Sequence, residues 1–204
     1  MKNFNINRAA NILYNARINL KKILKLPEDC TPSTLEEAYS IQNELTKKYL
    51  SENNKTTIIG KKIGCTNKAA QIQLNVNESF FGNIFSDNIS KTNVTIESKN
   101  FFSPFIEPEF SFLMSKELDI SKAPYKSEEV SKYILAVLPS IELVDSRFED
   151  WTSVGVKNLI TDNAVHAHWI YGNEVKNLNL FNFNNHSVDL YINDKLIEKG
   201  NSKN

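Results

Sequence analysis

Two glutamates, Glu107 and Glu109, stand two positions apart in a short stretch that otherwise has the pattern of a β-strand. Residues two apart in a strand project from the same face, which places the Cβ atoms of these glutamates roughly 7 Å apart. Like charges at that spacing disfavour each other's ionisation unless a cation neutralises them. The pair could therefore hold a hard divalent ion such as Mg²⁺, which prefers oxygen ligands. The alternative is an edge strand whose acidic face is simply solvated.

The opposite face of this stretch is apolar, as expected for a strand that packs on a core. It carries five side chains, Ile106, Pro108, Phe110, Phe112 and Met114. We therefore predict a strand over residues 106–114 whose apolar back is buried and whose front presents the two glutamates.

A third carboxylate, Glu142, lies inside the apolar run 141–144. Because an unpaired carboxylate in apolar surroundings is costly, this one must find a metal ion, an arginine or hydrogen bonds. A structural ion pair with Arg147, which is near in the sequence, or with another base is one possibility. Ligation of a metal fits the same residues equally well.

Two adjacent lysines, Lys61 and Lys62, lie between Gly60 and Gly64, where a predicted strand gives way to a short helix. Glycine lets the backbone approach a ligand closely, and the start of a helix offers free N–H groups to an anion. Because side chains alternate along a strand, we expect one lysine to face inward and the other to face solvent. A pair of ordinary surface lysines is the alternative.

Two histidines, His166 and His168, precede a predicted apolar strand over residues 169–172. Their spacing would suit metal ligation, but the sequence offers no further nitrogen or sulfur ligands beside them. We interpret them as residues that lie beside a site or at the edge of the core.

The composition limits the classes of partner. The 204 residues fit one domain, or one with a small appendage, and 24 basic residues balance 24 acidic ones. This balance argues against a nucleic-acid partner or an anionic membrane. No apolar run approaches the roughly 18 residues that a membrane span needs, and the N-terminus lacks the apolar region of a signal peptide. Cys30 and Cys65 have neither metal-type nor disulfide spacing, so we expect a reducing, cytoplasmic setting.

The elements that would position these residues follow from periodicity. We predict helices over residues 5–25 and from residue 33 onward, the second with a capping box of Ser33 and Glu36. A third helix is expected to begin at Ser127 and to end before Pro139. Extended segments are predicted at three places, 93–97, 140–147 and a hairpin over 188–197 with its turn at Asn193-Asp194.

Six motifs, taken together and in order, resemble the 2-keto-4-pentenoate hydratase and 4-oxalocrotonate decarboxylase branch of the fumarylacetoacetate hydrolase superfamily. They are Ala38-Tyr39-Ser40-Ile41-Gln42, Gly60-Lys61-Lys62-Ile63-Gly64-Cys65-Thr66, Phe81-Gly82, Ile106-Glu107-Pro108-Glu109-Phe110-Ser111-Phe112, Ile141-Glu142-Leu143-Val144-Asp145-Ser146-Arg147 and Asp162-Asn163-Ala164. No single motif is specific, whereas the ordered set is, and the resemblance covers nearly the whole chain.

The resemblance implies an α+β fold, a mixed β roll with outer helices. It divides the chain into an N-terminal helical region over residues 1–55 and a metal-binding β-roll domain over residues 56–204. It implies that Mg²⁺ or Mn²⁺ is held by three ligands, Glu107, Glu109 and Glu142. The implied substrate-binding residues are Lys62, Ile63 and Gly64, with Lys62 as the pocket lysine.

The implied activity is that of a hydro-lyase in the catabolism of aromatic compounds, which adds water to a 2-hydroxy-2,4-dienoate. The metal would stabilise the enolised form of a small 2-oxoacid, and Lys62 would add positive charge beside the developing oxyanion. The same site could serve a 4-oxalocrotonate-type decarboxylase, and hydrolysis of a carbon–carbon bond ranks last. Relatives of this kind assemble into homo-oligomers, and no nucleic acid or membrane partner is implied.

The chain departs from the family pattern at two places. The hydratases often have Pro-Asp where this chain has Ser79-Phe80, so a candidate acid–base carboxylate is lost. They often have serine after Asp-Asn-Ala, where this chain has Val165-His166, and His166 could replace the lost proton carrier. A plain packing role for His166 is the alternative.

The end of the chain also differs from the family. Family chains continue past the segment that resembles residues 194–200 with a helix and several strands that complete the sheet and one pocket wall. We therefore expect a chain truncated at its C-terminus, whose open sheet edge would be unpaired. A non-catalytic subunit or binding remnant of the family is the alternative from another functional class.

Overall fold

The structure is a computed structural model that describes residues 4–202. It combines helices and sheets, which confirms the predicted α+β class. The helices are α1 (Ile6–Ile18), α2 (Leu35–Glu52), α3 (Lys68–Gln73), α4 (Ser127–Val130) and α5 (Val156–Thr161). The strands are β1 (Ile58–Gly64), β2 (Phe80–Phe85), β3 (Ile89–Lys91), β4 (Phe105–Met114), β5 (Ile134–Val144), β6 (His166–Tyr171), β7 (Ser187–Ile192) and β8 (Lys195–Asn201). Within the described residues, no helix has the length and apolar character needed to span a bilayer.

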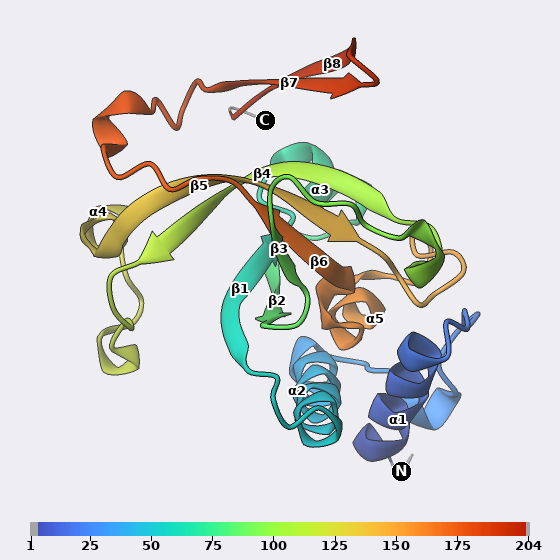
Figure 1. Cartoon of the computed structure of the whole chain (residues 1–204). Helices are drawn as coiled ribbons and strands as arrows, with labels where there is room; N and C mark the ends of the chain where they lie inside the picture. The colour runs from blue at the N-terminus through green and yellow to red at the C-terminus, as the bar shows by residue number, and fades with distance from the viewer. Residues whose placement is uncertain (1–3, 203–204) are drawn as a thin grey trace. The chain divides into compact units, whose positions relative to one another are not determined.

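The strands of this part of the chain pair in the orders β1–β2, β3–β6–β5–β4 and β7–β8 (Figure 1). The chain forms two compact units. The first comprises the chain up to Glu107 together with Glu142–Trp169, and the second comprises Pro108–Ile141 together with the chain from Ile170 onward. Strands β4, β5 and β6 contribute residues to both units. The division predicted from the sequence, after residue 55, stays a prediction.

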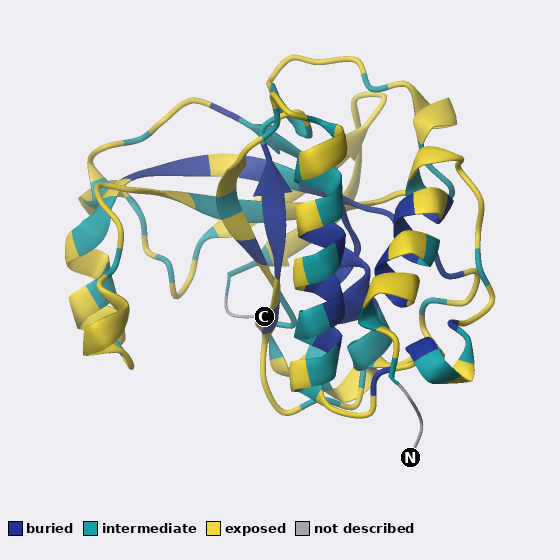
Figure 2. Cartoon of the chain, turned by 90° about the horizontal axis from the view of Figure 1, so that it is seen from below, coloured by how far each residue is buried: buried dark blue, intermediate teal, exposed yellow. Residues whose placement is uncertain are grey.

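Helices α1 and α2 supply the core of the first unit. Leu13 from α1 and Ile41 from α2 are fully buried and belong to one apolar cluster, which also includes Phe148. On both helices, buried positions follow one face and exposed positions the other (Figure 2), which is the pattern of amphipathic helices.

Helix α1 ends at Ile18, whereas the apolar spacing predicted a helix over residues 5–25. Leu20 has a positive φ of 47°, which is incompatible with a continuing α-helix. Beyond it, Ile23 forms a parallel β-bridge with Phe148. The predicted helix was therefore too long, because pairing with a distant segment takes the backbone groups that a further helical turn would need.

Two other local predictions are displaced by a few residues. The capping box of α2 consists of Thr34 and Glu37, not of Ser33 and Glu36. The segment 93–97 is not a strand, and the short strand β3 precedes it.

The third predicted helix was wrong over most of its length. Helix α4 stops at Val130, and residues 134–138, which were expected to continue the helix, open strand β5. Pro139 lies inside this strand rather than at a helix end. The consecutive residues Ala136–Leu138 are all buried, so both faces of the strand are covered here. A short apolar run of this kind fits a buried strand as well as one side of a helix.

In the second unit, strands β7 and β8 form the predicted antiparallel hairpin. Its turn residues, Asn193 and Asp194, have positive φ values of 50° and 61°. A two-residue turn with positive φ at both positions matches the right-handed twist of the flanking strands, and asparagine and aspartate tolerate positive φ better than most residues do. The hairpin prediction is confirmed.

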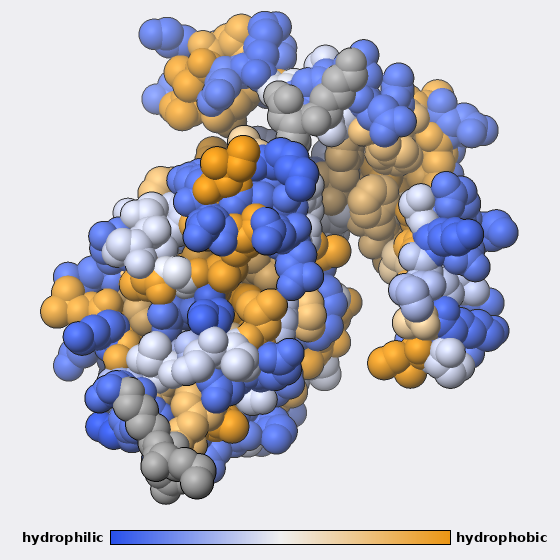
Figure 3. Space-filling model, turned by 180° about the vertical axis from the view of Figure 1, so that it is seen from behind, coloured by the Kyte–Doolittle hydropathy of each residue, from blue (hydrophilic) through white to orange (hydrophobic). Residues whose placement is uncertain are grey.

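The apolar back of β4 is not uniformly covered by the described residues. Phe110 packs against Phe181 and Phe183, with ring centroids 6.2 and 5.7 Å apart. Ile106 and Phe112 nevertheless remain exposed, so the prediction of a fully buried back was wrong. Figure 3 shows one face of the molecule, on which hydrophobic residues (orange) lie among hydrophilic ones (blue).

Candidate metal and substrate site

Three carboxylates that the sequence analysis selected come together at neighbouring strands. Glu107 and Glu109 lie on β4, and Glu142 lies on β5, which pairs with β4 in the sheet. One carboxylate oxygen from each lies within 4.8 Å of the other two. Carboxylate oxygens gathered in this way are the ligand type that a hard divalent cation takes. The role of the three residues as metal ligands stays a prediction.

The charges and burial around the carboxylates would also favour a bound cation. Burial raises the pKa of the Glu107 carboxyl above its usual value, and the nearby negative charge of Glu142 raises it further. The ammonium of Lys62 acts in the opposite direction. A cation held between the carboxylates would favour their charged forms for the same reason that Lys62 does.

The expected alternation of the two lysines is observed. Lys62 is 7% exposed, and its Nζ atom lies 3.0 Å from Oε2 of Glu142 and donates to the carbonyl oxygen of Ala164 at 3.3 Å. Lys61 is exposed on the other face of β1, where its ammonium hydrogen-bonds the side chain of Asn83 and lies 5.2 Å from the ring centroid of Phe81. Only Lys62 of this pair therefore contacts the carboxylate cluster.

The two other predicted substrate-binding residues lie on opposite faces of β1. Gly64 shares the face of Lys62, and a Cβ atom on Gly64 would lie 3.5 Å from the Lys62 Nζ atom. Ile63 is exposed and, two positions from Lys61, shares the outward face, so only its backbone can contribute beside Lys62. Substrate contact by these residues stays a prediction.

His166 is fully buried at the start of β6, next to the cluster. Its Nδ1 atom lies 2.7 Å from Oε1 of Glu142, and its Nε2 atom has no hydrogen-bond partner among residues 4–202. Burial lowers the pKa of the imidazole, and the contact with Glu142 opposes that shift only in part. The ring is therefore neutral at neutral pH. His168, by contrast, pairs with the Ser90 hydroxyl at 2.9 Å.

Arg147 is not the ion-pair partner of Glu142, and another base, Lys62, takes that place. Its guanidinium Nε donates to Oδ1 of Asp162 at 2.6 Å, and its Nη2 donates to the Asp162 carbonyl at 3.1 Å. The backbone N–H of Arg147 donates to the other carboxylate oxygen at 2.9 Å. Both side chains are almost completely buried. Asp162 thus ties the end of β5 to the turn that precedes β6, a role that the sequence analysis missed.

That turn has an unusual backbone. Asn163, Ala164 and Val165 have consecutive positive φ values of 54°, 52° and 57°. Such values are strained for a β-branched residue such as Val165 and persist only where the surroundings fix them. The Asn163 side chain provides part of that support, since it accepts from the backbone N–H of Asn83 at 2.7 Å and donates to the Asn83 carbonyl at 2.9 Å. The turn aims the carbonyl of Ala164 at Lys62.

A side chain at position 82 would disturb this turn, and Gly82→Ala should therefore destabilise the protein. A Cβ atom there would lie 2.3 Å from the carbonyl oxygen of Asn163, which is a backbone atom and has little room to move. We expect the free energy of unfolding to fall by about 3 kcal/mol, the upper range for overpacking. The matched control is Gly60→Ala in the paired strand, where a Cβ would meet only Ile84 at 3.7 Å. Urea unfolding of both variants measures the difference, and equal stabilities would contradict the close approach.

Gln42 on α2 is another buried polar residue that the sequence analysis left without a structural role. Its Nε2 atom donates to the carbonyl oxygens of Phe81 and Ile160, each at 2.9 Å. It therefore fixes α2 against α5, which precedes the turn at Asn163–Val165, and against β2, which packs on that turn. A polar residue on the otherwise apolar face of a predicted helix is the signal that could have revealed it.

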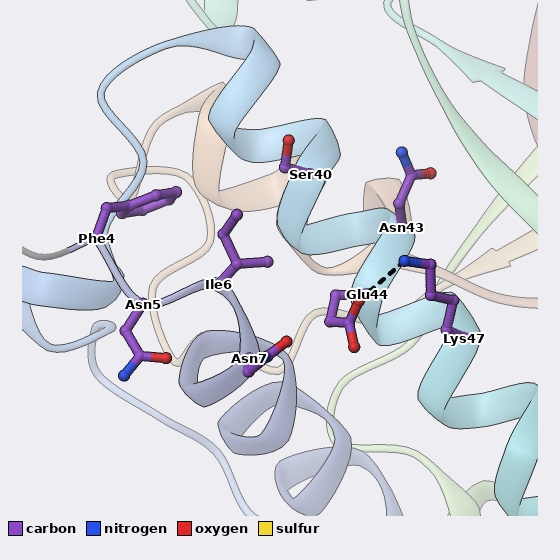
Figure 4. A pocket seen from close by; sticks show the side chains of 8 residues that line it. All are labelled: Phe4, Asn5, Ile6, Asn7, Ser40, Asn43, Glu44 and Lys47. Carbon is purple, nitrogen blue, oxygen red and sulfur yellow. Dashed lines mark hydrogen bonds and ion pairs between the residues drawn. The ribbon is translucent and has the colours of Figure 1, made fainter.

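A separate hollow of about 590 Å³ lies between the start of α1 and the middle of α2 (Figure 4). Its lining includes Asn7, Asn43, and an ion pair between Glu44 and Lys47 at 3.2 Å. None of the residues proposed for the carboxylate cluster lines this hollow.

Comparisons with known proteins give a consistent set of relatives, although no family model matches the chain. A 2-keto-4-pentenoate hydratase of Paraburkholderia xenovorans (strain LB400) is 30% identical over 164 residues, which are 80% of this chain and 59% of that protein. The chain thus spans about three fifths of that hydratase's length. A 4-oxalocrotonate decarboxylase of a Pseudomonas species is 28% identical over 192 residues, which are 91% of this chain and 72% of that protein.

The fold is shared with a solved structure. The 4-oxalocrotonate decarboxylase of Pseudomonas putida G7, complexed with magnesium and adipate, superposes with a TM-score of 0.87 at 24% sequence identity. The match covers 97% of this chain and 73% of that protein. The expected fumarylacetoacetate-hydrolase-like fold is therefore confirmed.

Proposed function

Since the chain is homologous to the 2-keto-4-pentenoate hydratases and 4-oxalocrotonate decarboxylases, we propose that it is a metal-dependent lyase of the hydratase type. Its substrate would be a small 2-hydroxy-2,4-dienoate, the enol form of a 2-oxoacid. The observation that carries the proposal is the cluster of Glu107, Glu109 and Glu142 with a buried lysine 3.0 Å from Glu142. A 4-oxalocrotonate-type decarboxylase is the second candidate, because relatives with both names match most of this chain.

The donor set fits a hard divalent cation. All three candidate ligands are carboxylates, which suit Mg²⁺ or Mn²⁺ better than softer metals. Related solved structures are described with magnesium or with calcium, both of them oxygen-seeking cations. When bound, the ion would supply Lewis-acid stabilisation of negative charge on the substrate oxygens.

Lys62 would contribute the second positive charge of the site. Its ammonium is held in a buried position by Glu142 and by the carbonyl of Ala164. A fixed charge in a site of low dielectric stabilises a developing oxyanion more strongly than the same charge does in water. His166 would act beside it as a neutral base, because burial lowers the pKa of its imidazole.

A paired assay tests the proposed reaction and separates the two candidates. The purified chain is given 2-hydroxypenta-2,4-dienoate in one reaction and 4-oxalocrotonate in another, each with MgCl₂ and with excess EDTA. We expect Mg²⁺-dependent loss of the dienoate absorbance and slower release of CO₂ from 4-oxalocrotonate. Faster decarboxylation would favour the second candidate, and turnover unaffected by EDTA would contradict the metal-dependent mechanism.

Removing the charge of one proposed ligand should strongly weaken metal binding. For Glu109→Gln we expect Mn²⁺ affinity to fall by at least about 100-fold. The loss of a residue that only hydrogen-bonds a metal ligand already costs roughly 10–100-fold in metal affinity, and the loss of a ligand should cost no less. Glu117→Gln, in an exposed position after the same strand, is the matched control and should bind as the wild type does. Isothermal titration with MnCl₂ measures both variants. Equal affinities for the two would argue against the carboxylate cluster as the metal site.

The proposal extends to self-association. Ile106 and Phe112 on β4 are exposed apolar residues, and exposed apolar patches often mark surfaces that meet another chain. A homo-oligomer is therefore expected, and light scattering coupled to size exclusion measures it. A monomer across the micromolar range would contradict this part of the proposal.

A further inference from the structure

The contact between His166 and Glu142 fixes which atom carries the imidazole proton. His166 Nδ1 and Glu142 Oε1 are 2.7 Å apart, and the side chains are 0% and 1% exposed. An ionised carboxylate can only accept hydrogen bonds, so the imidazole must donate through Nδ1–H. A hydrogen bond to a charged acceptor in a buried position is among the stronger ones in proteins. The contact therefore restrains the Glu142 carboxylate far more than packing alone would.

The same contact distinguishes the two oxygens of Glu142. Oε1 is taken by the imidazole, whereas Oε2 receives no well-oriented hydrogen bond from any described residue. Lys62 lies 3.0 Å from Oε2 as an ion-pair partner, but without hydrogen-bond geometry. Oε2 is thus the oxygen that remains for a cation.

The imidazole is itself held in place from its backbone. The carbonyl of His166 accepts from Nη2 of Arg17 at 2.8 Å, which links the start of β6 to helix α1 within the first unit. On the N-terminal side, the strained turn at Asn163–Val165 sets where β6 begins. The ring therefore has a fixed position from which to hold the carboxylate.

We propose that His166 is a positioning residue for Glu142: its Nδ1–H holds Oε1, so that Oε2 alone is presented to the divalent cation. The inference rests on the proposed metal site and adds a residue to it. Metal ligands are commonly oriented by hydrogen bonds of this type, whose loss costs 10–100-fold in metal affinity, to order of magnitude.

Two substitutions of matched shape test the proposal. His166→Asn keeps an N–H donor close to the position of Nδ1, and His166→Leu has nearly the same branched shape without a donor. We expect Mn²⁺ affinity, measured by titration calorimetry, to fall by about 10–100-fold in the leucine variant and to be largely retained in the asparagine variant. A thermal melt of each metal-free variant reports its folding separately. Equal affinities for the two variants would overturn the proposal, because packing alone would then explain His166.

Mn²⁺ binding by the wild type distinguishes a failure of this inference from a failure of the proposed function. If the wild type binds Mn²⁺ but both variants bind equally, only the positioning role is wrong. If the wild type binds no Mn²⁺, the metal site and the positioning role fall together.

A measurement on the wild type avoids any problem with the folding of variants. Long-range ¹H–¹⁵N correlation spectra of the metal-free chain identify the protonated ring nitrogen, and His168→Gln and His186→Gln assign the signals of the other two histidines. We expect the Nδ1–H tautomer for His166. The Nε2–H tautomer would overturn the proposal, because Nδ1 would then have no proton to donate to Glu142.

Discussion

Replacing Lys62 with methionine should remove most of the turnover and at the same time tighten the binding of a divalent cation. The lysine Nζ atom lies 3.0 Å from Oε2 of Glu142, so a cation that binds this oxygen must share it with the ammonium. Two unit charges about 4 Å apart repel each other by about 4 kcal/mol at an effective dielectric constant of 20. Removing the ammonium should therefore improve Mn²⁺ affinity by about tenfold or more, while turnover falls on the order of 10²–10³-fold.

The same substitution should destabilise the metal-free protein. Without the ammonium, the carboxylate of Glu142 stays buried beside the His166 imidazole, which lies 2.7 Å away, and has no compensating positive charge from Lys62. Breaking a buried pair by removing one member costs about 3–5 kcal/mol of unfolding free energy. Saturating Mn²⁺ should restore part of this loss, because a ligand that binds only the folded state stabilises it.

Lys61→Met is the matched control for these effects. The residue is adjacent in sequence, but its side chain projects from the opposite face of β1 and is exposed. Mn²⁺ affinity and turnover should be close to those of the wild type. If the two methionine variants behaved alike in calorimetry and in the dienoate assay, Lys62 would have no special relation to the carboxylates.

Replacing Arg147 with methionine should cost about 3–5 kcal/mol of unfolding free energy, since it leaves the charge of Asp162 buried without its partner. The two side chains are 2% and 1% exposed, and Nε of Arg147 lies 2.6 Å from Oδ1 of Asp162. The substitution should also disturb the proposed metal site. Asp162 immediately precedes the turn that contains Ala164, and the Ala164 carbonyl accepts a hydrogen bond from Lys62. We therefore expect lower stability together with weaker Mn²⁺ binding.

An exposed ion pair between Arg8 and Asp29, also in the first unit, is the control for the buried pair. Nη1 of Arg8 lies 2.7 Å from Oδ2 of Asp29, but these side chains are 53% and 36% exposed. Exposed pairs contribute roughly 0–1 kcal/mol, so Arg8→Met should change the unfolding free energy little. Guanidinium-induced unfolding of both variants measures the contrast. Similar losses for Arg8→Met and Arg147→Met would show that burial does not set the contribution of these pairs.

The residues of the carboxylate cluster could be predicted because their signals are local. The spacing of Glu107 and Glu109 defines one face of a strand, and Glu142 stands out as an acid in an apolar run. The inward direction of one lysine follows from the alternation of side chains along β1, and the order of the family motifs selects Lys62. What brings these residues together is the pairing of β4 with β5, which the sequence periodicity alone does not specify.

The supporting contacts could not be predicted because they join residues that are far apart in sequence. The pair of Arg147 and Asp162 forms next to a turn with positive φ values at Asn163–Val165, which no periodicity encodes. The need for glycine at position 82 arises from the carbonyl of Asn163, which is 81 residues away. The apolar residues over 134–138 predict a helix but form a strand, because a short apolar run fits both periods.

A crystal of the chain soaked in MnCl₂ reveals where a divalent cation binds. The anomalous difference map, recorded at a wavelength where manganese scatters strongly, should contain a peak bounded by the carboxylates of Glu107, Glu109 and Glu142, with Oε2 of Glu142 the nearer oxygen of that residue. A peak at any other place, or no peak at a MnCl₂ concentration that saturates the protein in solution, would mean that these three glutamates do not form a metal site.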